Sequence, residues 1–156
     1  MLQSDYEDQV CSIARTLELI GERWTILVLR EVFSGRRRFG QMQSILGVAR
    51  NVLSARLQRL VDEGILERRA YSERPRRFEY FLTEKGLDLW PVMVALMGWG
   101  DRHFAGPEGP PVVLVHKGEC GGRVNDRRIC ERCSRQLEAR QARAVPGPGA
   151  PAARAA

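Results

Sequence analysis

The chain has 156 residues, enough to bury one hydrophobic core without metal or disulfide staples. Its hydrophobic content of 44 % is ordinary for a globular protein, and the sequence contains no 18-residue apolar run, which excludes a transmembrane helix. The first ten residues, MLQSDYEDQV, lack the apolar stretch of a secretory signal, so we expect a cytoplasmic protein with no membrane partner. A formal net charge of +6 favours a polyanionic partner.

Four helices are predicted in the first half of the chain, because apolar residues recur there at helical spacing. The helical segments are 7–20, 22–34, 39–46 and 49–63. The last three end next to a glycine, a residue that commonly terminates helices (Gly35, Gly47 and Gly64). In the fourth helix, Leu53, Leu57 and Leu60 lie on one face, and we expect them to be buried.

Two β-strands are predicted after the fourth helix, over 65–71 and 78–82. Apolar residues occupy alternate positions of the second strand and are expected to face the core: Phe78, Tyr80 and Leu82. The arginine-rich segment between the strands, 72–77, is expected to form the tip of a β-hairpin.

A fifth helix is predicted over 84–104, and its apolar side chains point in nearly every direction around the helix. Because the pattern continues beyond Pro91, we expect this proline to kink the helix rather than end it. So much apolar surface is more than a monomer of this size can leave exposed. The sequence therefore predicts a homodimer that buries this helix and the N-terminal helix, and the alternative is a wholly internal helix.

The order helix, helix, tight turn, helix and β-hairpin is that of a winged helix-turn-helix. The predicted fold class is mainly α with a β-hairpin wing (α+β), followed by a C-terminal dimerisation helix and a small cysteine-containing extension. The winged helix-turn-helix domain, including that helix, is expected to span 7–104, and the extension 112–143. Residues 144–156, rich in alanine and proline, are expected to form a disordered tail.

The excess positive charge is concentrated in one block of the chain. Between Gly35 and Arg77 there are 11 basic and 4 acidic residues, a net charge of +7, which leaves the rest of the chain at −1. A solvated basic surface is the alternative, but the coincidence with a helix-turn-helix favours double-stranded DNA as the partner. In such a motif the second helix enters the major groove, and the hairpin tip reaches the flanking backbone or the minor groove.

Several short motifs occur in the order found in a known family. They are Cys11, Gly21 with Arg23-Trp24, Arg38-Phe39, Leu53 with Arg56-Leu57, Gly64, and Pro75 before Tyr80-x-Leu82-Thr83. Over about residues 11–100 the chain resembles the HxlR family of bacterial transcriptional regulators. The resemblance implies a homodimeric winged-helix protein that binds DNA as a repressor or activator. The chain has two histidines, no phosphate-binding glycine loop and no nucleophile motif, so we predict no enzymatic activity.

The predicted base-reading residues lie on the face of the fourth helix opposite Leu53. They are Asn51, Ser54 and Gln58, of which asparagine and glutamine can pair bidentately with adenine. Arg50, in the first turn of the helix, is expected to reach a guanine edge or a phosphate. Contacts to the DNA backbone are predicted for Arg37, Arg38, Gln41, Arg59, Arg74, Arg76 and Arg77.

For any single one of these residues the alternative is a solvated polar side chain. Arg56 lies near the buried edge of the fourth helix, and we interpret it as an ion-pair partner of Glu63 or Glu31. A two-fold dimer predicts a palindromic operator with half-sites about 34 Å apart or a multiple of that distance.

Four cysteines in a cytoplasmic protein indicate metal or redox chemistry before structural disulfides. His116-x3-Cys120 and Cys130-x2-Cys133 offer one nitrogen and three sulfurs, a ligand set for tetrahedral zinc. The alternatives are a thiol switch and an inert β-hairpin appendage. Cys11 stands where some members of the family carry a redox-sensing thiol, but we favour a quiet, packed thiol there, since Glu7 and Asp8 disfavour the thiolate.

Two interpretations of function follow. The first is a sequence-specific transcriptional regulator, expected to be a repressor, that binds a palindromic operator as a homodimer. The second is a metal- or redox-responsive sensor in which Cys11 or the cluster of His116, Cys120, Cys130 and Cys133 controls DNA binding.

Overall fold

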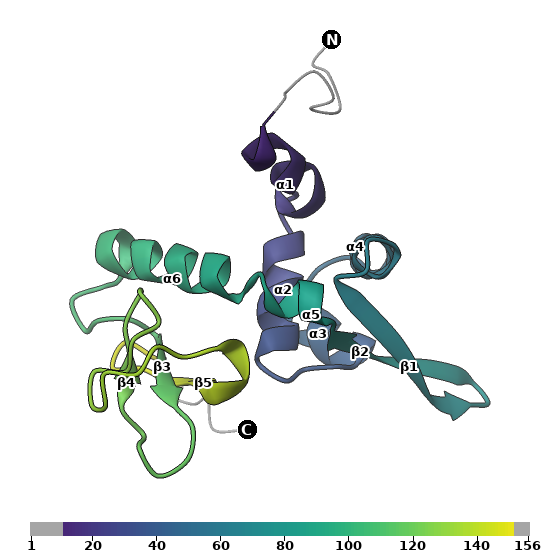
Figure 1. Cartoon of the computed structure of the whole chain (residues 1–156). Coiled ribbons are helices and arrows are strands. Elements are labelled where there is room, and N and C mark those ends of the chain that lie inside the picture. Colours follow the sequence, from purple (N-terminus) through teal and green to yellow (C-terminus); the bar gives the residue numbers. More distant parts are fainter. Residues whose placement is uncertain (1–10, 152–156) are drawn as a thin grey trace. The chain divides into compact units, whose positions relative to one another are not determined.

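The computed structural model describes residues 11–151, and the chain divides into two compact units between Gly86 and Leu87. The first unit holds helices α1 to α4 and the β1–β2 hairpin, and the second holds α6 and a three-stranded sheet (Figure 1). The long C-terminal helix, which the sequence analysis grouped with the winged helix-turn-helix, lies in the second compact unit, and the predicted domain boundary stays a prediction. None of the helices in the described range is long and apolar enough to cross a membrane.

The helices of the first unit are α1 (Ser12–Ile20), α2 (Thr25–Phe33), α3 (Phe39–Leu46) and α4 (Arg50–Asp62). Three of them, α2, α3 and α4, contact one another around a core. The fully buried side chains of this core are Val28, Leu29, Met42, Leu53, Leu57 and Leu60. The predicted buried face of α4 is thereby confirmed, and the opposite face of α4 is left exposed.

Helix α1 is shorter than predicted. Cys11 is its N-cap residue, with extended backbone angles, so the helix begins at Ser12 rather than at residue 7. Residues 7–10 of the predicted helix lie outside the described residues. The side chains of Ile13 and Leu17 are exposed on α1.

A tight turn joins α3 to α4. Gly47 ends α3 in the left-handed conformation (φ +61°), which a residue with a side chain rarely adopts. Val48 is buried directly after it, and Ala49 resumes extended backbone as the N-cap residue of α4. This turn sets α4 off from α3 as the second helix of a helix-turn-helix.

The wing is a longer hairpin than predicted. Strands β1 (Leu66–Glu73) and β2 (Arg76–Leu82) are antiparallel, with Leu66 opposite Leu82 and Glu73 opposite Arg76. Only Arg74 and Pro75 form the turn, and the Ser72 hydroxyl donates a 2.9 Å hydrogen bond to the Pro75 carbonyl there. Backbone pairing therefore extends through charged residues that the sequence pattern assigned to the tip.

The expected alternation of β2 is absent in the structure. Residues 78–82 are all half-buried, because both faces of this short ribbon are partly covered. Phe78, Tyr80 and Leu82 are accordingly not fully inserted in the core, and the prediction that they face it is corrected to partial burial on both faces.

The predicted helix over 84–104 is two helices, α5 (Glu84–Leu87) and α6 (Trp90–Phe104). Pro91 lies in the first turn of α6, where its missing N–H costs no helical hydrogen bond. The expectation of a kinked continuous helix was therefore wrong: the proline starts a helix.

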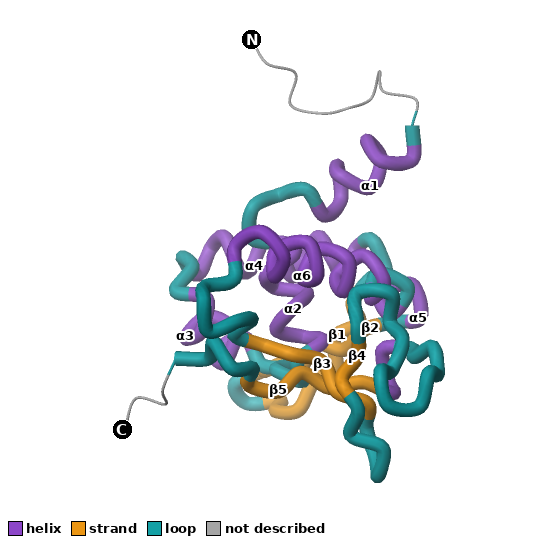
Figure 2. Tube along the Cα trace, turned by 90° about the vertical axis from the view of Figure 1, so that its left-hand side faces the viewer, coloured by secondary structure: helices purple, strands orange, loops and turns teal. Residues whose placement is uncertain are grey.

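The second unit contains a three-stranded antiparallel sheet in the order β4-β3-β5 (Figure 2). Its strands are β3 (Val112–His116), β4 (Arg123–Val124) and β5 (Ala142–Pro146), with a 3-10 turn, η1 (Ala139–Gln141), before β5. A small core contains the buried side chains of Leu114, Val124, Cys130, Leu137 and Ala142. The predicted disordered tail began at Ala144, but residues 144–146 pair with β3, and only 152–156 lie outside the described residues.

Candidate functional site

The exposed face of α4 carries the polar side chains that the sequence placed there. Asn51 and Ser54 are exposed, as is Arg50 at the start of the helix. Gln58 is also exposed, yet its side-chain amide donates to Asp62 at 2.7 Å and accepts from Arg68 of β1 at 3.3 Å. A base contact by Gln58 would replace these two hydrogen bonds, whereas Asn51 lies one turn or more away from them.

Two arginines of α4 are engaged within the first unit. Arg59 donates a 2.8 Å hydrogen bond to the backbone carbonyl of Glu18 in α1. Arg56 forms a 2.8 Å ion pair with Glu22, and its Nε is buried without a partner. The predicted partners of Arg56, Glu63 and Glu31, were wrong.

Glu31 does not pair with Arg56 but forms ion pairs that hold the loop preceding α3. Its carboxylate is buried and lies 2.6 Å from Arg30 and 3.0 Å from Arg36. A buried carboxylate needs such partners because its desolvation is costly. The contact holds the basic segment 36–38 against α2, and an acidic residue inside an apolar helix face was the sequence signal for it.

The same segment is also tied to the wing. The backbone N–H of Tyr80 donates to the Arg37 carbonyl at 2.9 Å, and Arg38 forms a 2.8 Å ion pair with Glu79. The hydrogen bond to Glu79 raises the pKa of Arg38. Gln41 accepts a 3.2 Å hydrogen bond from the Arg38 backbone N–H, which caps α3. The segment before α3 is thus joined to strand β2 of the wing by a backbone hydrogen bond and an ion pair.

Aromatic rings of the wing lie beneath several arginines. The guanidinium groups of Arg37 and Arg69 each lie 4.4 Å from the centroid of the Phe81 ring. Arg68 and Arg76 lie 4.8 and 5.2 Å from the centroid of Phe78. Cation–π contacts of this kind hold the cations at the surface in fixed places. Arg74 and Arg77 are exposed on the same hairpin, so the wing presents several positive charges to solvent.

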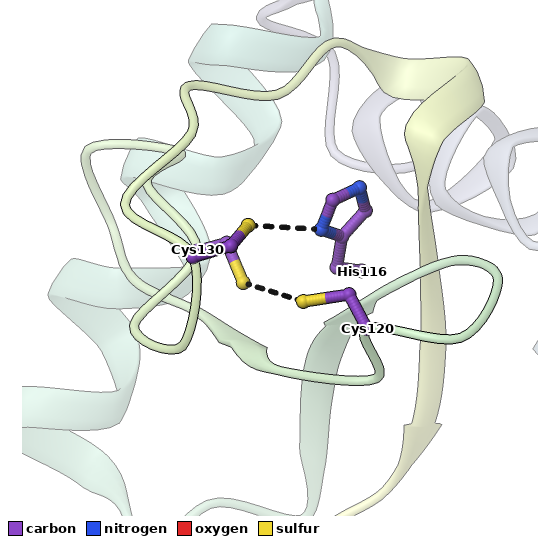
Figure 3. Close-up of side chains that lie close together, drawn as sticks. His116, Cys120 and Cys130 are labelled. Atoms are coloured by element: carbon purple, nitrogen blue, oxygen red, sulfur yellow. Dashed lines mark hydrogen bonds between the residues drawn. The ribbon is translucent and has the colours of Figure 1, made fainter.

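The four predicted metal ligands come together in the second unit. His116 ends β3, Cys120 follows in the next turn, and Cys130 and Cys133 lie in the loop between β4 and η1. Their four ligand atoms all lie within 4.8 Å of one another. The Sγ atoms of Cys120 and Cys130 are 3.6 Å apart (Figure 3). Cys133 Sγ lies 3.4 Å from His116 Nδ1.

The two short separations, 3.6 and 3.4 Å, are close to the edges of a metal-centred tetrahedron. With ordinary zinc bond lengths, two sulfurs would be about 3.8 Å apart and a sulfur and a nitrogen about 3.6 Å apart. The cluster can therefore hold a metal ion without a large rearrangement. Cys130 is buried and Cys120 half-buried, whereas Cys133 is exposed.

The backbone around the cluster is folded for close approach. Gly121 has a left-handed φ of +59°, and a Cβ on Gly122 would lie 2.6 Å from Cys130 Sγ. Burial raises the pKa of Cys130, but the backbone N–H groups of Cys133 and Arg132 and the side chains of His116 and Cys133 outweigh it and lower this pKa to about 6. A thiolate is the form that ligates metals.

Cys11 differs from its predicted environment. The sequence suggested a packed thiol, but Cys11 is exposed, because it precedes α1 instead of lying within it. Its Sγ accepts a 3.3 Å hydrogen bond from the Ala14 backbone N–H and so caps the helix.

Comparison with protein families matches residues 19–107 to the HxlR-like helix-turn-helix model. The chain belongs to the HxlR family. Among its relatives are uncharacterized HTH-type transcriptional regulators of Mycobacterium tuberculosis and Mycobacterium bovis, each 50 % identical over 138 residues, which are 88 % of this chain and 87 % of the relative. This HxlR-family protein is a DNA-binding transcriptional regulator and not an enzyme, as the sequence predicted.

Solved structures support the same assignment. The crystal structure of PA1607, a candidate transcription factor, is 35 % identical, with a TM-score of 0.66 over 84 % of this chain and 91 % of that one. The redox regulator HypR in its oxidized form is 29 % identical, with a TM-score of 0.57 over 62 % of this chain and all of that one. The HxlR match ends at residue 107, before the cluster of His116, Cys120, Cys130 and Cys133, whereas the mycobacterial alignments reach into the extension.

Proposed function

We propose that this HxlR-family regulator binds a palindromic operator as a homodimer and represses transcription by occupying it. The observation that carries the proposal is the exposed polar face of α4 beside a wing whose arginines are held by aromatic rings. In this arrangement Asn51, Ser54 and Arg50 read base edges, and the wing arginines contact phosphates. Repression needs only occupancy of a promoter.

The test is fluorescence anisotropy on DNA from the region upstream of the protein's own gene, against shuffled DNA, across a salt series. Preference for the native sequence with one dimer per site supports the proposal. Equal, strongly salt-dependent binding to both DNAs would show that the protein binds DNA only through its surface charge, and this result would overturn the proposal.

Two substitutions separate phosphate contacts from base reading. Arg76→Ala is expected to weaken binding to all sequences and to lower the slope of log K against log salt by about one unit, because one phosphate contact is lost. Asn51→Ala is expected to relax preference at one base position, at a cost of about 1–3 kcal/mol for the preferred base. Anisotropy on an operator panel measures both, and a uniform loss with Asn51→Ala would contradict its base-reading role.

Exposed apolar side chains support the homodimer. Val92, Leu96 and Trp99 follow one another at helical spacing on α6, and Trp99 is 51 % exposed. Trp99→Asp is expected to give monomers at micromolar concentration, because a carboxylate cannot be buried unpaired in such an interface. Ile45→Asp, at an exposed apolar residue of α3, is the matched control. Analytical ultracentrifugation measures the oligomeric state. A Trp99→Asp protein that remains dimeric would show that the interface lies elsewhere.

We also propose that zinc binds the cluster of His116, Cys120, Cys130 and Cys133. The convergence of the four ligand atoms within 4.8 Å of one another supports it, and three thiolates with one imidazole form a closed, structural zinc set. The sensor function is the second candidate: in it, metal or an oxidant at this cluster, or oxidation of the exposed Cys11, controls DNA binding. The structural likeness to HypR, a redox regulator, favours that candidate.

A further inference from the structure

The loop that joins the two pairs of metal ligands also packs against α6. Gly98 of α6 lies so close to Asp126 that a Cβ on the glycine would overlap the aspartate side chain. Arg102, one turn further along the helix, forms an ion pair with the same aspartate. Asp126 thus meets one side of α6 at two positions one turn apart.

Asp126 lies near the tip of a small hairpin that several hydrogen bonds hold together. The Asn125 side chain accepts from the backbone N–H groups of Arg127 at 3.0 Å and Ile129 at 2.9 Å. The Asn125 N–H in turn donates to the Ile129 carbonyl at 3.0 Å. Val124 and Cys130 pair across its base. One arm of this hairpin therefore ends at a metal ligand, and its tip is the part that contacts α6.

The extension has little else to hold this hairpin in place. Its buried apolar side chains are few, and a core of that size supplies too little free energy to order a segment of about 40 residues. Metal binding to four converging ligands supplies folding free energy directly, since the unfolded chain has no preformed site. The hairpin, the sheet and the metal would then form one cooperative element.

We propose that zinc in the cluster fastens α6: the metal fixes the hairpin 124–130, and the hairpin fixes the helix through Asp126. The inference rests on the zinc proposal and goes beyond it by assigning the metal a target within the fold. The metal site is a structural support for the helix that carries Val92, Leu96 and Trp99 on its exposed side. Gly98 is the contact residue that permits the close approach.

The test is hydrogen–deuterium exchange of the full chain, loaded with zinc and after removal of zinc by a chelator, with zinc content measured alongside. Zinc removal is expected to accelerate exchange of the α6 amides by about tenfold or more, while the amides of α2 and α4 keep their rates. Unchanged α6 exchange in a chain that has lost one equivalent of zinc overturns the fastening. A chain that never binds zinc overturns the zinc proposal, and this inference with it.

A matched pair of variants isolates the contact from the metal. Gly98→Ala places a Cβ against Asp126, whereas Gly100→Ala, two residues along the same helix, meets nothing within 4 Å. Both changes raise intrinsic helix propensity equally. We expect both variants to bind one zinc per chain, and only Gly98→Ala to exchange its α6 amides about tenfold faster. Equal exchange in the two variants would show that the Asp126 contact does not hold the helix.

Discussion

Replacing Cys130 with serine is expected to abolish stoichiometric zinc binding and to unfold the sheet of β3, β4 and β5. Cys130 is the buried cysteine of the cluster, and its backbone also pairs with Val124, so its loss removes a ligand from the small core. Loss of a structural zinc removes a large part of the free energy that folds such a unit. Zinc content by mass spectrometry under native conditions, and protection of residues 112–146 from proteolysis, measure the effect.

Cys11→Ser is the matched control, because Cys11 lies outside the cluster and is exposed. It is expected to retain one zinc per chain and the protease resistance of the extension. If Cys130→Ser retained a full equivalent of zinc, the ligand set would be wrong.

Cys130→Ser also distinguishes the two candidate functions. In a regulator whose zinc is structural, the first unit of the zinc-free protein keeps its base preference, although the affinity for DNA falls if dimerisation weakens. In a sensor, DNA binding switches with metal occupancy or with oxidant in the wild type, and Cys130→Ser is locked in one state. Anisotropy of wild type and variant, with zinc, with chelator and with peroxide, distinguishes the two patterns.

Gly86→Ala is expected to lower the free energy of unfolding by about 2 kcal/mol or more, the range for overpacked sites. A Cβ at this position would overlap the carbonyl oxygen of Ile65 and lie 3.0 Å from Leu82 Cδ2. The neighbouring backbone cannot move aside easily, because Thr83 Oγ1 bonds to the Gly64 carbonyl at 2.6 Å and accepts from the Gly86 N–H at 3.1 Å. The start of β1, the end of β2 and α5 thus pack closely around this glycine.

Gly40→Ala is a control for which we expect the free energy of unfolding to rise rather than fall. Gly40 lies within α3, and a Cβ there meets nothing within 4 Å. The change is expected to raise stability by about 0.5–1 kcal/mol through helix propensity alone. Urea unfolding followed by circular dichroism gives both values, and similar effects of the two substitutions would contradict the packing assigned to Gly86.

The parts of the fold that the sequence predicted are those set by local patterns. Leu53, Leu57 and Leu60 repeat along one helix face, and the glycine at 47 closes α3, so α4 could be placed within a residue or two. The metal cluster was also readable, because cysteine and histidine at ligand spacing have few structural uses. The close approach of its ligand atoms could not be predicted, since it depends on the turn at Gly121 and Gly122.

Contacts between residues far apart in the chain were missed. Arg56 pairs with Glu22 and Arg38 with Glu79, at separations of 34 and 41 residues, and several carboxylates were equally plausible partners by spacing. The length of the wing was missed because backbone pairing, and not side-chain alternation, determines where β1 and β2 end. Strand β5 was missed for the same reason, since its partner β3 compensates for a weak local propensity.

The tie between Arg37, Arg38 and the second wing strand has a consequence for the shape of the DNA. Tyr80 and Glu79 bind this segment at the start of α3, so these contacts fix the spacing between the helix-turn-helix and the wing. If α4 and the wing both contact DNA as proposed, the duplex would have to adjust its own curvature to that spacing. We therefore expect pyrimidine–purine steps, which bend most easily, between the two contacts, at positions that no side chain reaches.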